Sequence, residues 1–422
     1  MITIFSEHIT ERIIFVLDFC FKEKGQDYKL ISVADEWEFS KFKHINYSNQ
    51  ELEAELQIIP QGILFESEIH QSKKINLEEN KIVIDGVADQ LGVIFYLLTR
   101  YESYFSSKKD DHDRLESRFN SLVKMDLNKT VVVDRLVKGI WDELHLDYGE
   151  VQRNFKFTPT FDIDVAWAYK NRKFIRSIGA ILKGKKPFER IQVLLGLKKD
   201  PYDTYSVIRE IATKTDGILC FILLGDWGKY DKNIHWENNA YGSLIRGLNL
   251  EGEVGIHPSY SSYLNRSKVN EERERLVKIT GHKIKRSRQH FLRLRIPDSY
   301  QVLNEIGMKE DHSMGFADNI GFRAGTSFPF HFFDLIKNEK TELKIIPFAY
   351  MDSALKDYLK MSPDSAIAEI KNLLNEVKEV GGEFNFIWHN SSIHGTDEWQ
   401  GWRTVLDQTV EMGIALKDSY ED

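Results

Sequence analysis

The sequence of 422 residues contains only two cysteines, Cys20 and Cys220, which lie 200 positions apart within apolar segments. A disulfide framework is therefore excluded, and both thiols are predicted to be buried and free. No run of about 18 apolar residues occurs, because Asp18 interrupts the longest candidate, which extends from Ile13 to Phe21. The N-terminus also lacks a basic segment and a small-residue cleavage site, so we expect no signal peptide and a cytoplasmic location.

Positive charge is in the minority, since 57 Lys and Arg stand against 65 Asp and Glu and give a formal net charge of −8. This balance argues against a nucleic-acid-binding protein, which is usually basic. A hydrophobic content of 42% is enough for a large core and excludes a mostly disordered chain. At roughly 100–200 residues per domain, the length predicts two or three domains.

The apolar pattern changes near residue 150. Residues 1–150 mix short strands with helices and predict a smaller α+β domain that carries no recognisable chemical motif. Residues 151–422 alternate strand-like and helical segments, which predicts an α/β domain with a parallel sheet, either open or closed into a barrel. The strands predicted in this second domain are Phe155–Phe161, Ile218–Leu224, Glu253–His257, Ile284–Leu294, Leu343–Ala349 and Glu383–Trp388. A helix is predicted over Asp364–Val380, capped by Asp364 or Ser365.

Acidic and histidine residues follow three of these strands. Asp162 and Asp164 close the first strand, and His257 and His389 close two later ones. Carboxylates and imidazoles bind divalent ions, and an unligated carboxylate can accept a proton from the attacking water. Alone, an Asp-x-Asp pair is typical of a solvated loop, and a lone histidine is typical of a structural role. Their repeated placement at strand ends favours metal-assisted hydrolysis, because catalytic groups of α/β barrels lie at the carboxyl ends of the strands.

These motifs resemble those of the polysaccharide deacetylases, the NodB-type carbohydrate esterases, over about residues 152–415. The resemblance implies a distorted (β/α) barrel that holds Zn²⁺, or else Co²⁺ or Ni²⁺, and removes acetyl groups from N- or O-acetylated sugars. Thr160-Phe161-Asp162-Ile163-Asp164 resembles the first family block, which makes Asp162 the general base and Asp164 a metal ligand. His257 resembles the first histidine of an H-x-x-x-H block and is the second expected ligand.

The second histidine of that block is replaced by Ser261, and a serine hydroxyl is a poor zinc ligand. Either the metal is bound more weakly, or another group completes the site, or the protein is inactive. His290 is the candidate for the missing imidazole. In the same segment, Arg288 resembles the family arginine that orients the base. Arg323, within Gly321–Thr326, is a second candidate for that arginine and a candidate substrate-binding residue.

The remaining resemblance lies near the C-terminus. Asp352 resembles the fourth family block, with a catalytic role, and His389 resembles the histidine that acts as general acid in the fifth. Trp388, Asn390 and Tyr260 are predicted to bind substrate. Several aromatic rings could stack on sugars, although each is more typical of ordinary core packing: Trp167, Tyr169, Trp227, Trp236, Trp388 and Trp399.

Residues 170–199 form a basic segment with ten Lys or Arg and a single acid, Glu189, interleaved with apolar residues. Such a segment can lie on an anionic membrane, meet an anionic glycan, or be a solvated face over a core. The first interpretation predicts an enzyme that acts at the inner surface of a membrane.

Three hypotheses follow from the sequence. The first is a metal-dependent deacetylase of an acetylated carbohydrate. The second is a catalytically silent carbohydrate-binding relative that lost the metal through Ser261. The third is hydrolysis of a phosphoester or an amide at a similar metal site.

Overall fold

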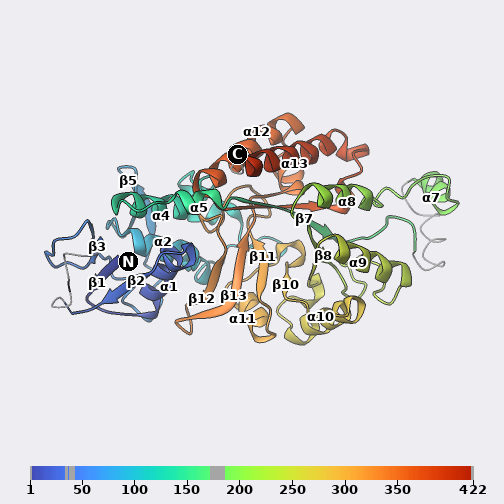
Figure 1. Cartoon of the computed structure of the whole chain (residues 1–422). Coiled ribbons are helices and arrows are strands. Elements are labelled where there is room, and N and C mark those ends of the chain that lie inside the picture. The colour runs from blue at the N-terminus through green and yellow to red at the C-terminus, as the bar shows by residue number, and fades with distance from the viewer. Residues whose placement is uncertain (1, 34–36, 38–42, 172–185, 420–422) are drawn as a thin grey trace.

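The computed structural model describes residues 2–33, 37, 43–171 and 186–419 (Figure 1). Its strands form a four-stranded parallel sheet in the order β2-β1-β3-β4, a hairpin of β5 and β6, and a nine-stranded sheet. The four-stranded sheet and the hairpin contain β1 (Ile2–Ser6), β2 (Tyr28–Ile31), β3 (Lys43–Tyr47), β4 (Leu56–Ile58), β5 (Ile75–Glu78) and β6 (Lys81–Ile84).

The N-terminal part contains helices of which the first two are largely buried. They are α1 (Glu11–Cys20), α2 (Gln90–Leu98), α3 (Ser121–Lys124), α4 (Val132–Glu143) and α5 (Gly149–Arg153). Thr10 caps α1, because its side-chain oxygen accepts a hydrogen bond from the Ile13 amide. Eight of the nine residues of α2 are buried, which explains its continuous apolar sequence. Cys20 and Cys220 are both buried and free, which confirms that prediction.

The large sheet has the order β12-β13-β11-β10-β9-β8-β7-β15-β14. All its neighbouring strands are parallel except β12 and β13. The strands are β7 (Lys156–Ile163), β8 (Leu219–Ile222), β9 (Glu253–Ile256), β10 (Arg286–Ser287), β11 (Glu310–Met314), β12 (Phe330–Asp334), β13 (Glu339–Pro347), β14 (Tyr350–Met351) and β15 (Glu383–His389).

The sheet curls until its two sides meet at the carboxyl end of β13. There the Phe348 amide donates to the Met314 carbonyl at the end of β11, and the Ala349 amide donates to the Asn385 carbonyl of β15. The chain that leaves β13 therefore enters β14 on the opposite side of the sheet. This closure confirms the predicted α/β fold with a distorted barrel.

Helices cover the outside of the barrel (Figure 1). They are α8 (Tyr205–Lys214), α9 (Asn239–Glu251), α10 (Arg266–Thr280), α11 (Asp298–Glu305), α12 (Pro363–Val380) and α13 (Trp402–Asp418). The helix α7 (Pro187–Leu194) lies apart from them, at the far right of Figure 1. The predicted cap of α12 was wrong by two to three residues. Ser362 caps this helix by accepting from the Ser365 amide, and Pro363 occupies its first turn.

The strand predicted over Ile284–Leu294 is also wrong in extent, since β10 contains only Arg286 and Ser287. Beyond it the Gln289 amide donates to the Ser313 side chain instead of continuing the ladder, and a 3-10 turn begins at His290. The chain therefore turns across the mouth of the barrel there, which brings His290 to the carboxyl ends of the strands.

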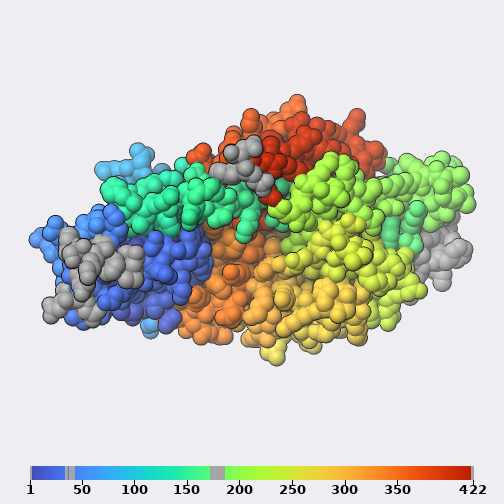
Figure 2. Space-filling view, in the orientation of Figure 1, coloured from blue at the N-terminus to red at the C-terminus, as the bar shows by residue number. Residues whose placement is uncertain are grey.

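The N-terminal part, blue to teal in Figure 2, packs against the barrel. Phe15 of α1 contacts Phe333 of β12 with ring centroids 5.1 Å apart, and the buried apolar residues of both parts belong to one cluster. The division at residue 150 stays a prediction. No helix within the described ranges is long and apolar enough to cross a membrane.

Candidate active site

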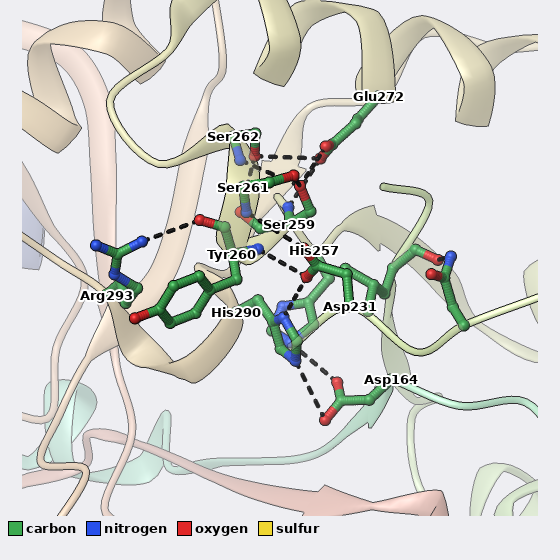
Figure 3. A network of polar contacts seen from close by, with 12 residues as sticks. Asp164, Asp231, His257, Ser259, Tyr260, Ser261, Ser262, Glu272, His290 and Arg293 are labelled. Carbon is green, nitrogen blue, oxygen red and sulfur yellow. Dashed lines mark hydrogen bonds and ion pairs between the residues drawn. The ribbon is translucent and has the colours of Figure 1, made fainter. Parts of the chain in front are cut away.

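Three side chains converge at the carboxyl ends of the barrel strands (Figure 3). Asp164 follows β7, His257 follows β9, and His290 begins the turn after β10. One ligand atom from each lies within 4.8 Å of the others. The His257 Nε2 atom is 3.2 Å from Asp164 Oδ1, and the His290 Nε2 atom is 3.6 Å from Asp164 Oδ2. The group matches the Asp and His donors that hold zinc in hydrolases.

Partners behind the two imidazoles fix their orientation. His257 Nδ1 lies 2.6 Å from the Arg288 carbonyl oxygen, and His290 Nδ1 lies 3.0 Å from Asp231 Oδ1. Both partners are acceptors, so each Nδ1 donates and each Nε2 faces Asp164. Asp164 Oδ1 is itself buried without a hydrogen-bond partner. An acceptor carboxylate facing two imidazole nitrogens is the arrangement that a divalent cation satisfies, so the donor set fits a metal ion.

The carboxylates and imidazoles of this group stabilise one another's charged forms. Burial opposes the charged form of His290, but the Asp164 and Asp231 carboxylates outweigh it and raise the pKa of His290 to about 9. Burial also opposes ionisation of Asp164, but His290 and His257 hold the pKa of Asp164 well below its usual range. A metal ion must displace the His290 proton, so metal affinity is expected to fall as the pH is lowered.

Asp162 lies on β7 two residues before Asp164 and is 3% exposed. One of its oxygens accepts a hydrogen bond of 2.8 Å from the Arg288 guanidinium, and the other lies 3.7 Å from His257 Nε2. Arg288 is fully buried, donates through Nε to the His312 carbonyl oxygen, and stacks over the Phe221 ring at 4.2 Å. The arginine therefore fixes one Asp162 oxygen, while the other faces the candidate metal-binding group, which consists of Asp164, His257 and His290.

His389, at the end of β15, approaches from a further strand. Its Nδ1 atom lies 2.7 Å from Asp352 Oδ1, and its backbone amide donates to Asp352 Oδ2. Its Nε2 atom lies 3.7 Å from Asp164 Oδ2. Burial disfavours the imidazolium, but Asp352 and Asp164 outweigh burial and raise the pKa of His389 to about 10. His389 is thus held with a proton available on the side of the metal-binding group.

Ser261 points away from this group (Figure 3). Its hydroxyl contacts the Ser259 hydroxyl at 3.0 Å, and its amide donates to Asp231. His290, the candidate for the missing imidazole, lies with Asp164 and His257 instead. Asp231 therefore has two roles, because it orients His290 and also binds the Tyr260 and Ser261 amides.

Three residues predicted to bind substrate lie elsewhere. Trp388 is fully buried, so its ring offers no face to a sugar. Asn390 is 1% exposed and donates to the Val165 and Tyr202 carbonyl oxygens, which fixes the turn after β15. Arg323 is buried near Arg100, outside the cavity at the metal-binding group, and burial lowers its pKa to about 10.

Tyr260 stands beside the cavity in an aromatic cluster with His112, Tyr230 and Phe291. The Arg293 guanidinium lies over the Tyr260 ring at 4.0 Å. Among the predicted sugar-stacking rings, Trp399 lines the cavity.

Sequence reasoning missed Asp231, Arg114 and Tyr358. Asp231 supports His290, and the other two line the same cavity as Asp162, Asp164 and His257. None belongs to a strand or to a spaced motif. Among these three residues, only Asp231 had a signal in the sequence, because it is an acid that comes soon after a buried strand.

Comparisons with known proteins gave different results for the N-terminal part and for the barrel. Residues 2–148 match a family model described as a family of unknown function, DUF7033. This match assigns no activity. Among the curated proteins, none matches this sequence.

Solved structures resemble about three fifths of the chain. A Mycobacterium smegmatis protein described as a polysaccharide deacetylase is 14% identical, with a TM-score of 0.40, over 61% of this chain and 84% of its own. A polysaccharide deacetylase from Bacillus cereus is 12% identical, with a TM-score of 0.29, over 61% and 85%. A CE4-family pseudoenzyme from Bacillus anthracis is 14% identical, with a TM-score of 0.29, over 61% and 60%. Because these values are low, we infer no function from them.

Glu272 lies behind the site, against Ser259, and makes a pH-dependent contribution to the stability of the protein. It accepts hydrogen bonds from the Ser259 amide and hydroxyl, while burial raises its pKa from 4.5 to about 7. As the pH rises, the unfolded chain loses this proton first. Below about pH 4.5 the protonated Glu272 makes its full contribution to the free energy of unfolding. This contribution, about 3 kcal/mol, is lost as the pH rises from about 4.5 to about 7.

We therefore expect Glu272→Gln to be more stable relative to wild type at pH 8 than at pH 5, as measured by urea unfolding. The other acids with raised pKa values, Asp89, Asp134 and Asp311, are present in both proteins and cancel in this comparison. An equal stability difference at the two pH values would contradict the assignment.

Proposed function

We propose that the protein is a metal-dependent hydrolase that removes acetyl groups from acetylated sugars. The observation that carries the proposal is the arrangement of five side chains around one cavity. Asp164, His257 and His290 offer ligands to one ion, Asp162 stands beside them held by Arg288, and His389 faces them with its Nδ1 on Asp352. This arrangement supplies a Lewis acid, a base and an acid to one reacting group.

The side chains divide the reaction between them. A divalent ion, with Zn²⁺ favoured over Co²⁺ or Ni²⁺, would polarise the acyl carbonyl and increase the acidity of a water molecule. Asp162 accepts the proton of the attacking water, and Arg288 keeps the carboxylate aligned. His389 then donates a proton to the departing amine or alkoxide, and Asp352 stabilises the imidazolium.

The cavity has the size and lining that suit a sugar. Its volume is about 440 Å³, within the usual range for small-molecule sites. Its wall combines aromatic rings with hydroxyl groups, which are contributed by Tyr358, Trp399, Ser353, Ser391 and Ser392. Rings can cover the apolar face of a pyranose, and hydroxyls can exchange hydrogen bonds with it.

The first test is elemental analysis of protein purified without chelators or a metal-binding tag. About one equivalent of Zn²⁺, Co²⁺ or Ni²⁺ per chain is expected, followed by acetate release from a panel of N- and O-acetylated oligosaccharides. Protein that takes up no metal even from excess would overturn the hydrolase proposal. It would favour the silent carbohydrate-binding alternative, which glycan-binding assays would then examine.

We also propose peripheral contact with an anionic membrane through residues 186–199, at the far right of Figure 1; the remainder of the basic segment, 172–185, lies outside the described residues. The segment exposes large apolar side chains that soluble surfaces normally lack. They are Phe188 (81% exposed), Ile191 (39%), Leu194 (43%), Leu195 (68%) and Leu197 (76%). Lys186, Lys198 and Lys199 flank them, so insertion of these apolar side chains would bring ammonium groups to the lipid headgroups.

Flotation with vesicles is expected to detect this contact. The protein should float with vesicles of phosphatidylglycerol and phosphatidylcholine, and less with phosphatidylcholine alone. Phe188→Ser combined with Leu195→Ser should lower the partition coefficient onto the vesicles by about 10²-fold or more, since two side chains of roughly 1.5–3 kcal/mol each are lost from the membrane-buried set. Leu250→Ser is the matched control, because Leu250 is 86% exposed on another helix. An unchanged bound fraction in the double variant would refute the contact.

A further inference from the structure

The turn that carries His290 has an unusual backbone. The two residues after this ligand, Phe291 and Leu292, have φ values of 58° and 52°. Side chains with a Cβ rarely adopt this left-handed region, so two such residues in sequence need support from their surroundings. The position of the His290 imidazole depends on this turn, because its backbone leads directly into Phe291.

The support comes from the N-terminal part of the chain. The Arg114 guanidinium donates to the Phe291 carbonyl oxygen at 3.0 Å, to the Tyr358 hydroxyl at 3.0 Å and to Asp110 Oδ2 at 2.7 Å. Asp110 also accepts from the Arg114 amide, so the arginine is held from both ends. Arg114 is 7% exposed and lines the cavity together with Phe291 and Tyr358.

The opposite side of the turn is held to the same N-terminal segment. Arg293 donates through Nε to the His112 carbonyl oxygen at 2.9 Å and through its other arm to the Tyr260 carbonyl oxygen at 2.9 Å. The His112 ring packs against Phe291 with centroids 4.9 Å apart. Contacts from residues 110–114 therefore enclose the left-handed turn.

We propose that Arg114 is a positioning residue of the metal site, which holds the His290-bearing turn in its left-handed conformation. The proposal rests on the proposed function. Without the guanidinium, the Phe291 peptide is free to rotate toward ordinary φ values. That rotation draws the His290 Nε2 atom away from Asp164 and from His257. The N-terminal part thereby contributes to a site whose ligands all lie on the barrel.

Zinc titration against a chromophoric chelator tests this role. Arg114→Ala is expected to bind zinc about 10–100-fold more weakly than wild type, the usual effect of removing a group that orients a ligand. Arg118→Ala is the matched control, because Arg118 lies on the same segment, is exposed and pairs with Glu116; it should bind zinc like wild type. Thermal unfolding of both metal-free variants checks that they fold.

A second pair of variants distinguishes a positioning role of Arg114 from a general loss of structure. Glycine adopts positive φ at no steric cost, so a turn with Phe291→Gly depends less on Arg114. The loss of affinity caused by Arg114→Ala should therefore be smaller by about threefold or more in the Phe291→Gly background than in wild type. Equal losses in the two backgrounds, or wild-type affinity in Arg114→Ala, would overturn the proposal.

Failure of the proposed function would be recognised separately. If wild type takes up no zinc, hydrogen exchange of the amides at residues 289–293 is compared in the metal-free proteins. Faster exchange in Arg114→Ala than in Arg118→Ala supports the positioning role even then. Equal exchange in the two variants would refute it.

Discussion

Asp162→Asn is expected to retain zinc and to lower the rate of acetate release by about 10²–10⁴-fold, the usual contribution of a general base. Asparagine keeps the shape of the side chain and can still accept a hydrogen bond from Arg288, but its amide cannot take a proton from water. Zinc is retained because the ligand atoms that converge belong to Asp164, His257 and His290. The decrease should appear in kcat, with metal content measured in the same samples.

Asp357→Asn is the matched control for this experiment. Asp357 lines the same cavity and pairs with the neighbouring Lys356, without contact to the metal-binding group. Its loss of charge should leave the rate within a few-fold of wild type. Full activity in Asp162→Asn would remove Asp162 from the role of base, and loss of zinc from that variant would identify Asp162 as a ligand.

His290→Ala is expected to abolish tight zinc binding, with an affinity loss larger than the about 10–100-fold that follows removal of a supporting group. Three side chains form the donor group, so deletion of one imidazole leaves two, and water is a weaker substitute for the third. Competition with a chromophoric chelator measures the loss, and acetate release should disappear with it.

Ser261→Ala provides the comparison, because position 261 is where the family pattern places a histidine. The Ser261 hydroxyl contacts Ser259 and not the ligand group, so its removal should change zinc affinity less than about twofold. Loss of zinc in Ser261→Ala with retention in His290→Ala would reverse the assignment of the two positions.

The class of the fold could be predicted because buried parallel strands are continuous apolar runs separated by amphipathic helices. The runs around Phe161, Phe221 and Trp388 all become central strands of the barrel. The strands of the smaller sheet gave weaker patterns, because each has only three to five residues. Ile2–Ser6 and Lys43–Tyr47 were missed, and Ile284–Leu294 was too long because its apolar residues continue into the turn at His290.

The candidate site could be predicted in part for a related reason. Asp162, Asp164, His257 and His389 lie at the carboxyl ends of strands or directly after them, so the parallel sheet alone places them at one edge. His290 entered only as a candidate, since its position depends on the turn after β10. Trp388 was misjudged because the alternation of a strand that is buried on both faces does not reveal which way a ring points.

By itself, the sequence determined an α/β barrel with acids and histidines at its strand ends, two buried thiols and a basic segment at residues 170–199. These properties follow from local periodicity and from the residues next to it. The tertiary structure alone decided that His290 stands where the pattern has Ser261, and that Asp231 and Arg114 hold it in place. Their contacts join residues 59 and 177 positions apart, between loops without periodicity, so only the folded chain brings them together.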